Sequence, residues 1–483
     1  MNRENIVYNL MWRFAERCGA QIVQLIVSIV LARLLAPTDY GIIAMMNVFI
    51  SIMDVFVSCG LNGALIQKKD ADEVDFSSVF YAQMFFCIVL YIVLFFSAPH
   101  ISSFYEMPEM KNMIRVLGIT LIIAGVKNVQ TAFVSRTMQF KKFFFSTLGG
   151  TIGAAVIGIG LAYAGFGTWA LIGQSLFNNI VDTIILWCTV KWRPKKKFSF
   201  ERLKGLFNYS WKLLVSSLLE TVYSNLRSLV IGKKYSSSDL AYYEKANSWP
   251  NLLINNINSS MNSVLFPVMS SVQENPRKVK AMTRRAIKTS TYVIAPMMMG
   301  LAACGVPLTR LVLTEKWLPS VPFMVIFCIT SMFYPIHTAN LNAIKAMGRS
   351  DLFLKLEIIK KIVGLVALII TVPISVMAMG YSLLFTSVAS QIINSWPNKK
   401  LFDYGYLEQI KDILPGILLA IGMGICVWTV TLIGLPDFPT LCIQIPLGCG
   451  IYILGSQIFK LDSFEYIMAI VRPIVNKIVQ RNK

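Results

Sequence analysis

Apolar runs alternate with short polar turns from one end of the chain to the other. Residues 119–124, 365–372 and 416–430 are typical of these runs. A helix that crosses a bilayer needs about 20 mostly apolar residues, and the pattern divides into about fourteen such segments. Most are joined by short turns with glycine or proline, which interrupt helices. The sequence therefore predicts an all-α polytopic membrane protein with about 14 transmembrane helices.

The composition agrees with this interpretation and excludes other classes. Of the 483 residues, 55% are hydrophobic and 14% are charged, whereas a soluble domain carries roughly 25% charged residues. A soluble enzyme, a secreted disulfide scaffold and a disordered chain are therefore excluded.

The charge balance is strongly basic, with 45 Lys and Arg against 25 Asp and Glu and a formal net charge of +20. In a soluble protein this would suggest nucleic acid. Here most basic residues lie in the N-terminal segment and in every second loop, where the positive-inside rule places them. We therefore expect no nucleic-acid partner. We expect a multi-pass protein of the cytoplasmic (inner) membrane with both termini cytoplasmic and membrane lipids as its surroundings.

Weak internal similarities recur at an offset of 200 to 213 residues. Asp39 corresponds to Asp239, residues 61–65 resemble residues 261–265, and Gly167 corresponds to Gly380. With six spans in each repeat, both repeats keep the same orientation, so a pseudo-twofold axis along the membrane normal and a substrate site between the halves are expected. The pattern predicts two parallel six-helix repeats plus two C-terminal helices.

These repeats set the predicted domain boundaries. They are an N-lobe at 1–192, a cytoplasmic linker at 193–207, a C-lobe at 208–400, a final helix pair at 401–459 and a basic tail at 460–483. The tail is amphipathic and basic, so we expect it to lie on the inner leaflet.

Polar residues follow one face of four predicted spans, the first, second, seventh and eighth. In the eighth, asparagines are spaced by three or four residues, which places them on one helical face. The candidates on three of these faces are Gln21, Gln24, Asn47, Ser51, Asp54, Asn247, Asn251, Asn255 and Asn258. An unsatisfied polar group in lipid costs several kcal/mol, so these faces must meet in a helix interface or in a hydrated cavity.

Both alternatives have physical support. Interhelical hydrogen bonds contribute about 0.6 kcal/mol each on average. Amides and hydroxyls also donate and accept, so a wall of them suits a sugar with many hydroxyls. We favour a glycan chamber, because the polar run extends over four helices related by the repeat.

Basic residues inside predicted spans are candidates for binding an anionic headgroup, because a central Arg or Lys costs roughly 2.5–3.5 kcal/mol on insertion scales. The candidates are Arg17, Arg33, Lys127 and Arg227. Lys127 has no acidic residue within one turn of its own helix, so it is the best candidate for a lone cation. Arg227 could instead pair with Glu220, and Arg33 could extend to the interface.

An enzymatic interpretation has little support. Asp70 and Asp72 have the D-x-D spacing of some metal-binding glycosyltransferases, but acids just before a helix are ordinary caps. Glycine pairs such as Gly158 and Gly160 lie in an apolar span with no preceding strand, so they are not nucleotide loops. We expect no catalytic residue, no metal and no cofactor.

Several short motifs resemble the polysaccharide-transporter family of the multidrug/oligosaccharidyl-lipid/polysaccharide flippase superfamily. They are Leu31-Ala-Arg-Leu-Leu-Ala-Pro-Thr-Asp-Tyr-Gly41, Gly63-Ala-Leu-Ile-Gln-Lys68, Gly165-Phe-Gly-Thr-Trp-Ala-Leu171, Val264-Leu-Phe-Pro267 and Ala346-Met-Gly-Arg349. Within the family the chain is most similar to the branch of colanic-acid and teichuronic-acid exporters.

The resemblance implies fourteen helices in two lobes that alternate in access. It implies that undecaprenyl-diphosphate-linked oligosaccharide is flipped outward for exopolysaccharide, O-antigen (lipopolysaccharide) or teichuronic-type synthesis, with a polymerase and glycosyltransferases as partners. Two alternatives stay open. One is a multidrug or cation antiporter of the same superfamily, for which Asp54 would serve. The other is a membrane polymerase or ligase. The sugar, the coupling ion and the oligomeric state stay undetermined.

Overall fold

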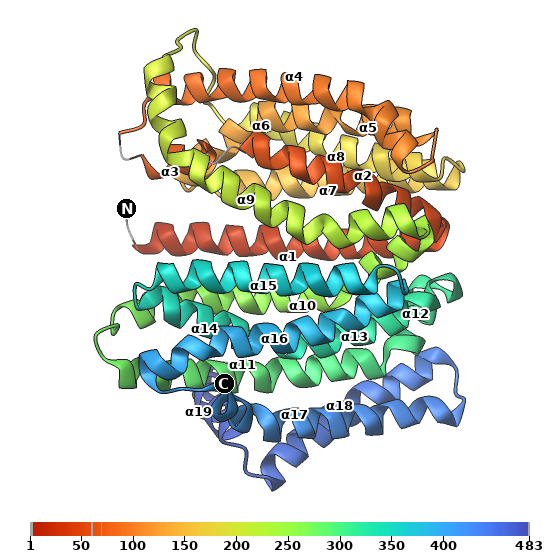
Figure 1. The fold of residues 1–483 in the computed structure, drawn as a ribbon, viewed down its shortest axis with the longest axis vertical. Helices are drawn as coiled ribbons and strands as arrows, with labels where there is room; N and C mark the ends of the chain where they lie inside the picture. Colours follow the sequence, from red (N-terminus) through yellow and green to blue (C-terminus); the bar gives the residue numbers. More distant parts are fainter. Residues whose placement is uncertain (1–2, 59–60, 69, 482–483) are drawn as a thin grey trace. The chain divides into compact units, whose positions relative to one another are not determined.

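The computed structural model describes residues 3–58, 61–68 and 70–481, and this part of the chain is helical with no β-strand. It forms two compact units, Met1–Ala241 and Tyr242–Lys483, and Figure 1 shows the long helices of each unit running alongside one another. The division falls inside helix α10, whereas the sequence analysis placed a linker at 193–207.

The first unit holds nine helices and the start of a tenth. They are α1 (Arg3–Leu34), α2 (Pro37–Ser58), α3 (Leu61–Gln67), α4 (Glu73–Phe104), α5 (Met110–Leu117), α6 (Ile119–Arg136), α7 (Lys141–Tyr163), α8 (Thr168–Thr189), α9 (Phe200–Lys234) and α10 (Ser237–Ser270). Helix α9, predicted to belong to the second lobe, packs on α2, α3 and α4 of the first unit.

The second unit continues from α10. Its helices are α11 (Pro276–Ala303), α12 (Gly305–Leu313), η1 (Glu315–Ser320), α13 (Val321–Met332), α14 (Tyr334–Ala346), α15 (Ser350–Thr371), α16 (Val376–Phe402), α17 (Tyr406–Thr429), η2 (Val430–Ile433), α18 (Asp437–Ile458) and α19 (Asp462–Arg481). Within it, α11 packs against α17, α13 and α14.

Nine helical stretches among the described residues are long and apolar enough to cross a membrane, and α11 with α12, bent by 67°, makes a tenth. The other long helices are α1, α9, α10 and α15, of 32, 35, 34 and 22 residues. Together with these four, the described residues form fourteen long helical stretches, which is the predicted number. The predicted class, an all-α polytopic membrane protein, is confirmed.

Small residues determine how closely α7 and α8 approach. Gly149, Gly150, Gly153 and Gly158 of α7 face α8, and a β-carbon on any of them would lie 2.6 to 2.9 Å from an α8 side chain. Helix association in a bilayer depends on such close packing, because lipid tails are as apolar as leucine. The glycine face of α7 therefore fixes the position of α8, which carries Asp182.

Segment 190–199 is non-helical and lies against the first unit. Trp192 is 8% exposed and packs among Phe76, Phe80 and Phe133, while the Lys195 backbone N–H donates to Ser77 Oγ at 3.0 Å. Helix α9 then begins at Phe200. The start of the predicted linker is therefore part of the packed first unit.

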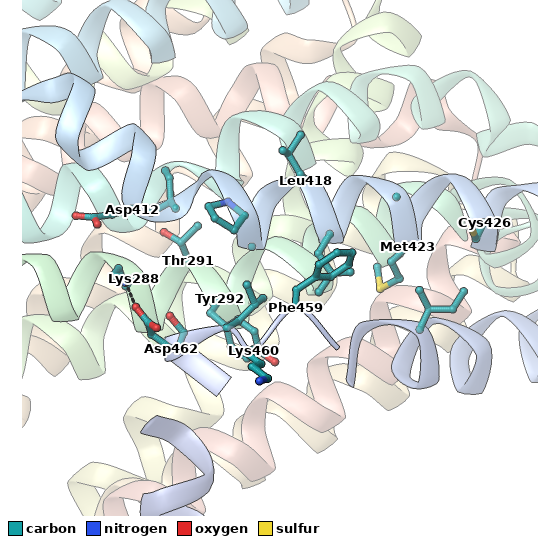
Figure 2. A pocket seen from close by; sticks show the side chains of 18 residues that line it. Lys288, Thr291, Tyr292, Asp412, Leu418, Met423, Cys426, Phe459, Lys460 and Asp462 are labelled. Carbon is teal, nitrogen blue, oxygen red and sulfur yellow. Dashed lines mark hydrogen bonds and ion pairs between the residues drawn. The ribbon is translucent and has the colours of Figure 1, made fainter. Parts of the chain in front are cut away.

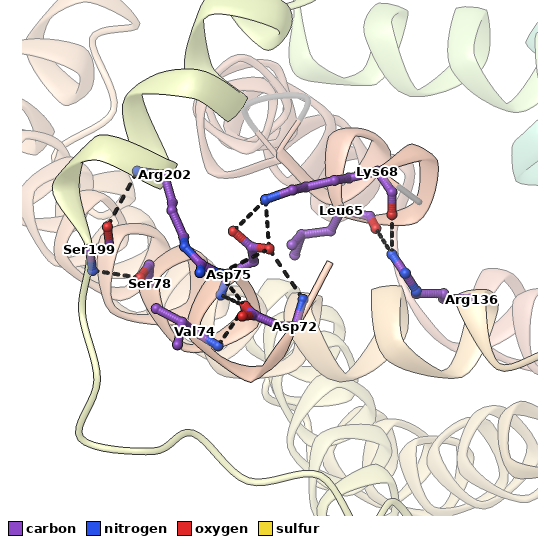
Figure 3. A network of polar contacts seen from close by, with 9 residues as sticks. All are labelled: Leu65, Lys68, Asp72, Val74, Asp75, Ser78, Arg136, Ser199 and Arg202. Atoms are coloured by element: carbon purple, nitrogen blue, oxygen red, sulfur yellow. Dashed lines mark hydrogen bonds and ion pairs between the residues drawn. The ribbon is translucent and has the colours of Figure 1, made fainter. Parts of the chain in front are cut away.

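A charged network holds the start of α4 next to the start of α9 (Figure 3). Asp72 caps α4, and its side chain accepts from the backbone of Asp75 in a capping box. Asp75 is fully buried and accepts from Lys68 Nζ at 2.8 and 2.7 Å. Arg202 of α9 reaches Asp72 at 2.6 Å and Asp75 at 3.7 Å. The expected capping role of Asp72 is therefore confirmed.

Candidate functional site

The first unit contains a basic side chain held between helices. Lys127, on α6, lies 3.1 Å from Asp182 Oδ2 and 3.4 Å from Asn179 Oδ1, both on α8. The two charged side chains are 21% and 19% exposed. The expectation that Lys127 is a lone cation is wrong. Its carboxylate partner is 55 residues away in the sequence and could not be found by inspecting one helix.

A second carboxylate lies near this pair. Asp54, on α2, is exposed and is within electrostatic range of Lys127, and α2 packs on both α6 and α8. Asp182 Oδ1 is buried and has no hydrogen-bond partner in the described part of the chain. The group therefore combines one ammonium, two carboxylates and the Asn179 amide.

The other candidates of the first unit lie on α1, α2 and α9. Gln21, Gln24, Arg33 and Asn47 are exposed and Arg227 is half-buried. The side chain of Arg17 lies outside the described residues, and the candidate at Ser51 is half-buried and donates to the Val48 carbonyl at 2.9 Å. Their roles stay predictions.

The asparagine face of α10 divides into two environments. Asn251 Nδ2 donates to Asn247 Oδ1 at 2.9 Å, one turn apart on the same helix, and Asn255 is exposed. Asn258 is 7% exposed and accepts from Thr338 Oγ1 at 3.2 Å. One end of the face is thus an interhelical contact with α14, whereas Asn255 is exposed.

A buried polar network in the second unit was missed. Asn340 Nδ2 donates to Ser395 Oγ at 3.0 Å and to Gln409 Oε1 at 2.8 Å, and Asn398 Nδ2 donates to Asn340 Oδ1 at 2.8 Å. It joins α14, α16 and α17. The available signal was the spacing of Gln391, Asn394, Ser395 and Asn398 on one face of α16. Within the described residues, no cluster of His, Cys, Asp and Glu is suited to a metal ion.

Comparison with known proteins decides the family. Residues 30–322 match the family described as "Polysaccharide biosynthesis protein". The chain belongs to this family.

Curated relatives extend the match. The chain is 22% identical to the "Succinoglycan biosynthesis transport protein ExoT" of Rhizobium meliloti, over 72% of this chain and 71% of that protein. It is 23% identical to the "Teichuronic acid biosynthesis protein TuaB" of Bacillus subtilis, over 89% of both chains. It is 20% identical to the "Lipopolysaccharide biosynthesis protein WzxC" of Escherichia coli, over 76% of this chain and 74% of that protein. The family predicted from the motifs is confirmed.

Solved structures agree on the fold. The inward closed conformation of the lipid II flippase MurJ covers 93% of this chain and 98% of that one, with a TM-score of 0.72 and 18% identity. The match to an inward-facing multidrug resistance transporter of the MATE family covers 79% of this chain and 95% of that transporter, with a TM-score of 0.62 and 14% identity. The chain thus has the fold of these membrane transporters.

Proposed function

We propose that this protein flips an undecaprenyl-diphosphate-linked oligosaccharide from the inner to the outer leaflet of the cytoplasmic membrane by alternating access. Its family and the transport and biosynthesis names of its relatives support this function. The basic loop ends face the cytoplasm in this proposal, with both termini inside.

The observation that carries the proposal is the position of Lys127, held among membrane helices by a carboxylate and an amide. A diphosphate carries about two negative charges, and its transfer into a low-dielectric passage is costly unless cations meet it. Lys127 can meet a phosphate by leaving Asp182. Asp182 then stands near Asp54 without its counter-charge, so headgroup binding and carboxylate protonation become linked.

The test separates the structural role of Lys127 from its transport role. Lys127→Gln leaves Asp182 unpaired and should destabilise the protein by about 3 kcal/mol or more, if the carboxylate stays ionised. Adding Asp182→Asn should restore stability, because neither member of the Lys127–Asp182 pair is then charged. If Lys127 binds the headgroup, this stable double variant still fails to transport.

Transport is measured in vesicles, by exposure of a labelled undecaprenyl-diphosphate oligosaccharide to an outside lectin. Lys127→Arg keeps the positive charge and should therefore transport better than Lys127→Gln. Lys355→Gln on α15 is the control for the loss of an exposed positive charge. Wild-type transport by the stable double variant would contradict the proposed role of Lys127.

A multidrug or cation antiporter is the second candidate, favoured by one observation. Asp54 is an exposed carboxylate near the Lys127–Asp182 pair, so the group has one more negative than positive charge. An antiporter predicts that Asp54→Asn abolishes efflux of a cationic dye. The flippase function predicts no dye efflux by the wild type.

A further inference from the structure

A groove in the second unit combines a long apolar wall with a basic end (Figure 2). Its volume is about 730 Å³, and it is lined by α11, α17, α18 and the turn before α19. This volume lies within the range of roughly 300–1,000 Å³ that is usual for ligand pockets. The groove lies wholly within one unit, so its shape does not depend on how the two units are placed.

The apolar wall is mainly α17, from Ile413 to Cys426. At 1.5 Å per residue this stretch is ~20 Å long, and the hydrocarbon of one leaflet is ~15 Å thick. Leu418, on this wall, is 58% exposed, so this side of α17 is not covered by other helices of the unit. Its length and its open side suit an extended acyl chain.

Two glycines of α17 keep the groove open. A β-carbon on Gly422 would meet no atom within 4 Å, and one on Gly416 would meet only the Tyr452 hydroxyl, at 3.9 Å. Both residues line the groove. The space beside this helix is therefore empty of protein atoms because the side chains are missing, and a larger residue would enter it without a clash.

Charged residues collect at the end near Asp412, as Figure 2 shows. Lys288 pairs with Asp462 at 2.7 Å, and Arg284 pairs with Asp412 at 2.5 Å. This end continues into a second hollow of about 520 Å³, lined by Arg284, Arg285 and Lys288.

Two basic groups remain beyond these ion pairs. Arg285 lies 3.9 Å from the centre of the Tyr466 ring, and Lys460 is exposed in the turn before α19. In the described part of the chain neither has a carboxylate partner. Basic pockets between membrane helices bind anionic lipid headgroups, so the positive charge at this end favours a phosphate.

We propose that this groove binds an anionic phospholipid, with one acyl chain along α17 and the phosphate between Arg285 and Lys460. The hydroxyls in the lining, such as Thr291 and Ser463, are few and lie toward the basic end. A glycan needs many hydrogen-bonding groups, so the lining favours a lipid over a sugar. The site is separate from the proposed transport site at Lys127.

The test compares lipids retained by the purified full chain in native mass spectrometry, with palmitoyl-oleoyl phosphatidylglycerol and phosphatidylcholine as probes. The wild type should retain phosphatidylglycerol preferentially. Gly422→Leu should reduce this binding at least tenfold. Gly450→Leu on α18, where a β-carbon also meets nothing within 4 Å, should leave it unchanged. If Gly422→Leu does not fold, Gly422→Ala tests the same space.

The headgroup contact is tested separately. Arg285→Gln and Lys460→Gln should each lower the preference for phosphatidylglycerol about fivefold, since a basic residue near a lipid surface contributes about 1 kcal/mol. Lys355→Gln should have no effect. Equal retention of both lipids, or unchanged binding by Gly422→Leu, would overturn the proposal. Displacement of the phospholipid by undecaprenyl phosphate, but not the reverse, would also overturn it and assign the groove to the carrier lipid.

Discussion

The carboxylates of Asp39 and Asp239, 200 residues apart in the sequence, make the same local contact. Asp39 Oδ2 accepts from the backbone N–H of Ala36 at 3.0 Å, and Asp239 Oδ2 accepts from that of Ser236 at 3.2 Å. Each residue lies in the first turn of its helix, where a negative charge is favourable. The two sequence repeats therefore begin their second helices with the same turn.

Gly41, two residues after Asp39, permits the backbone at the start of α2 to lie close to the backbone at the start of α10. A β-carbon at Gly41 would lie 1.8 Å from the carbonyl oxygen of Ser237. Gly41→Ala should therefore destabilise the first unit by several kcal/mol, because a backbone atom cannot move aside cheaply. Thermal unfolding in detergent measures the effect. Gly160→Ala on α7, where nothing lies within 4 Å, is the matched control and should be neutral or stabilising. Equal unfolding temperatures for the two variants would contradict the contact.

The sequence was sufficient for features that depend on one helix at a time. Apolar length identified the class, and spacing placed the asparagines of α10 on one face. It was not sufficient where the partner lies on another helix. Lys127 meets Asp182 because α6 packs against α8, and Asn258 meets Thr338, which is 80 residues away in the sequence. The packing of Trp192 also depends on tertiary structure, because nothing in segment 190–199 itself indicates which aromatic residues enclose it.

Asp75 should be essential to the stability of the first unit. Its buried carboxylate neutralises Lys68 and lies near Arg202. Asp75→Asn removes the charge and should cost about 3 kcal/mol, less where water reaches the partly exposed cations. The measurement is the midpoint of thermal unfolding. Asp70→Asn, an exposed residue in the same loop, provides the control. A loss no larger than that of the control would show that the network contributes little.

The contact between Asp72 and Arg202 should make stability depend on pH. The hydrogen bond from Arg202 is the main cause that lowers the pKa of Asp72 to about 2, whereas an unperturbed aspartate has a pKa of about 3.9. Because the folded pKa is lowered, the contact stabilises the protein fully above about pH 4 and is lost as the pH falls towards 2.

Arg202→Gln tests this dependence. It should lower the unfolding temperature at pH 6. The difference from the wild type should shrink at pH 2.5, because Asp72 of the unfolded chain is largely protonated there and the contact has lost most of its stabilising effect. Lys204→Gln, on the same helix and exposed, should show no such change. A difference that is the same at both pH values would mean that Arg202 acts through packing rather than through its charge.

The asparagine face of α10 offers the sharpest comparison between a hydrated chamber and a dry interface. Asn255 is exposed, whereas Asn258 is 7% exposed and bonded to Thr338. Cysteine at position 255 should react with a water-soluble maleimide in membranes, and cysteine at position 258 should react much more slowly. Cysteine at Leu253, on the opposite side of the helix from Asn255 and half-buried, is the comparison and should not react with the water-soluble reagent. Added oligosaccharide substrate should protect position 255 if it lines the glycan path. Protection of 255 without substrate would mean that the whole face is a dry helix contact, and the chamber would have to lie elsewhere.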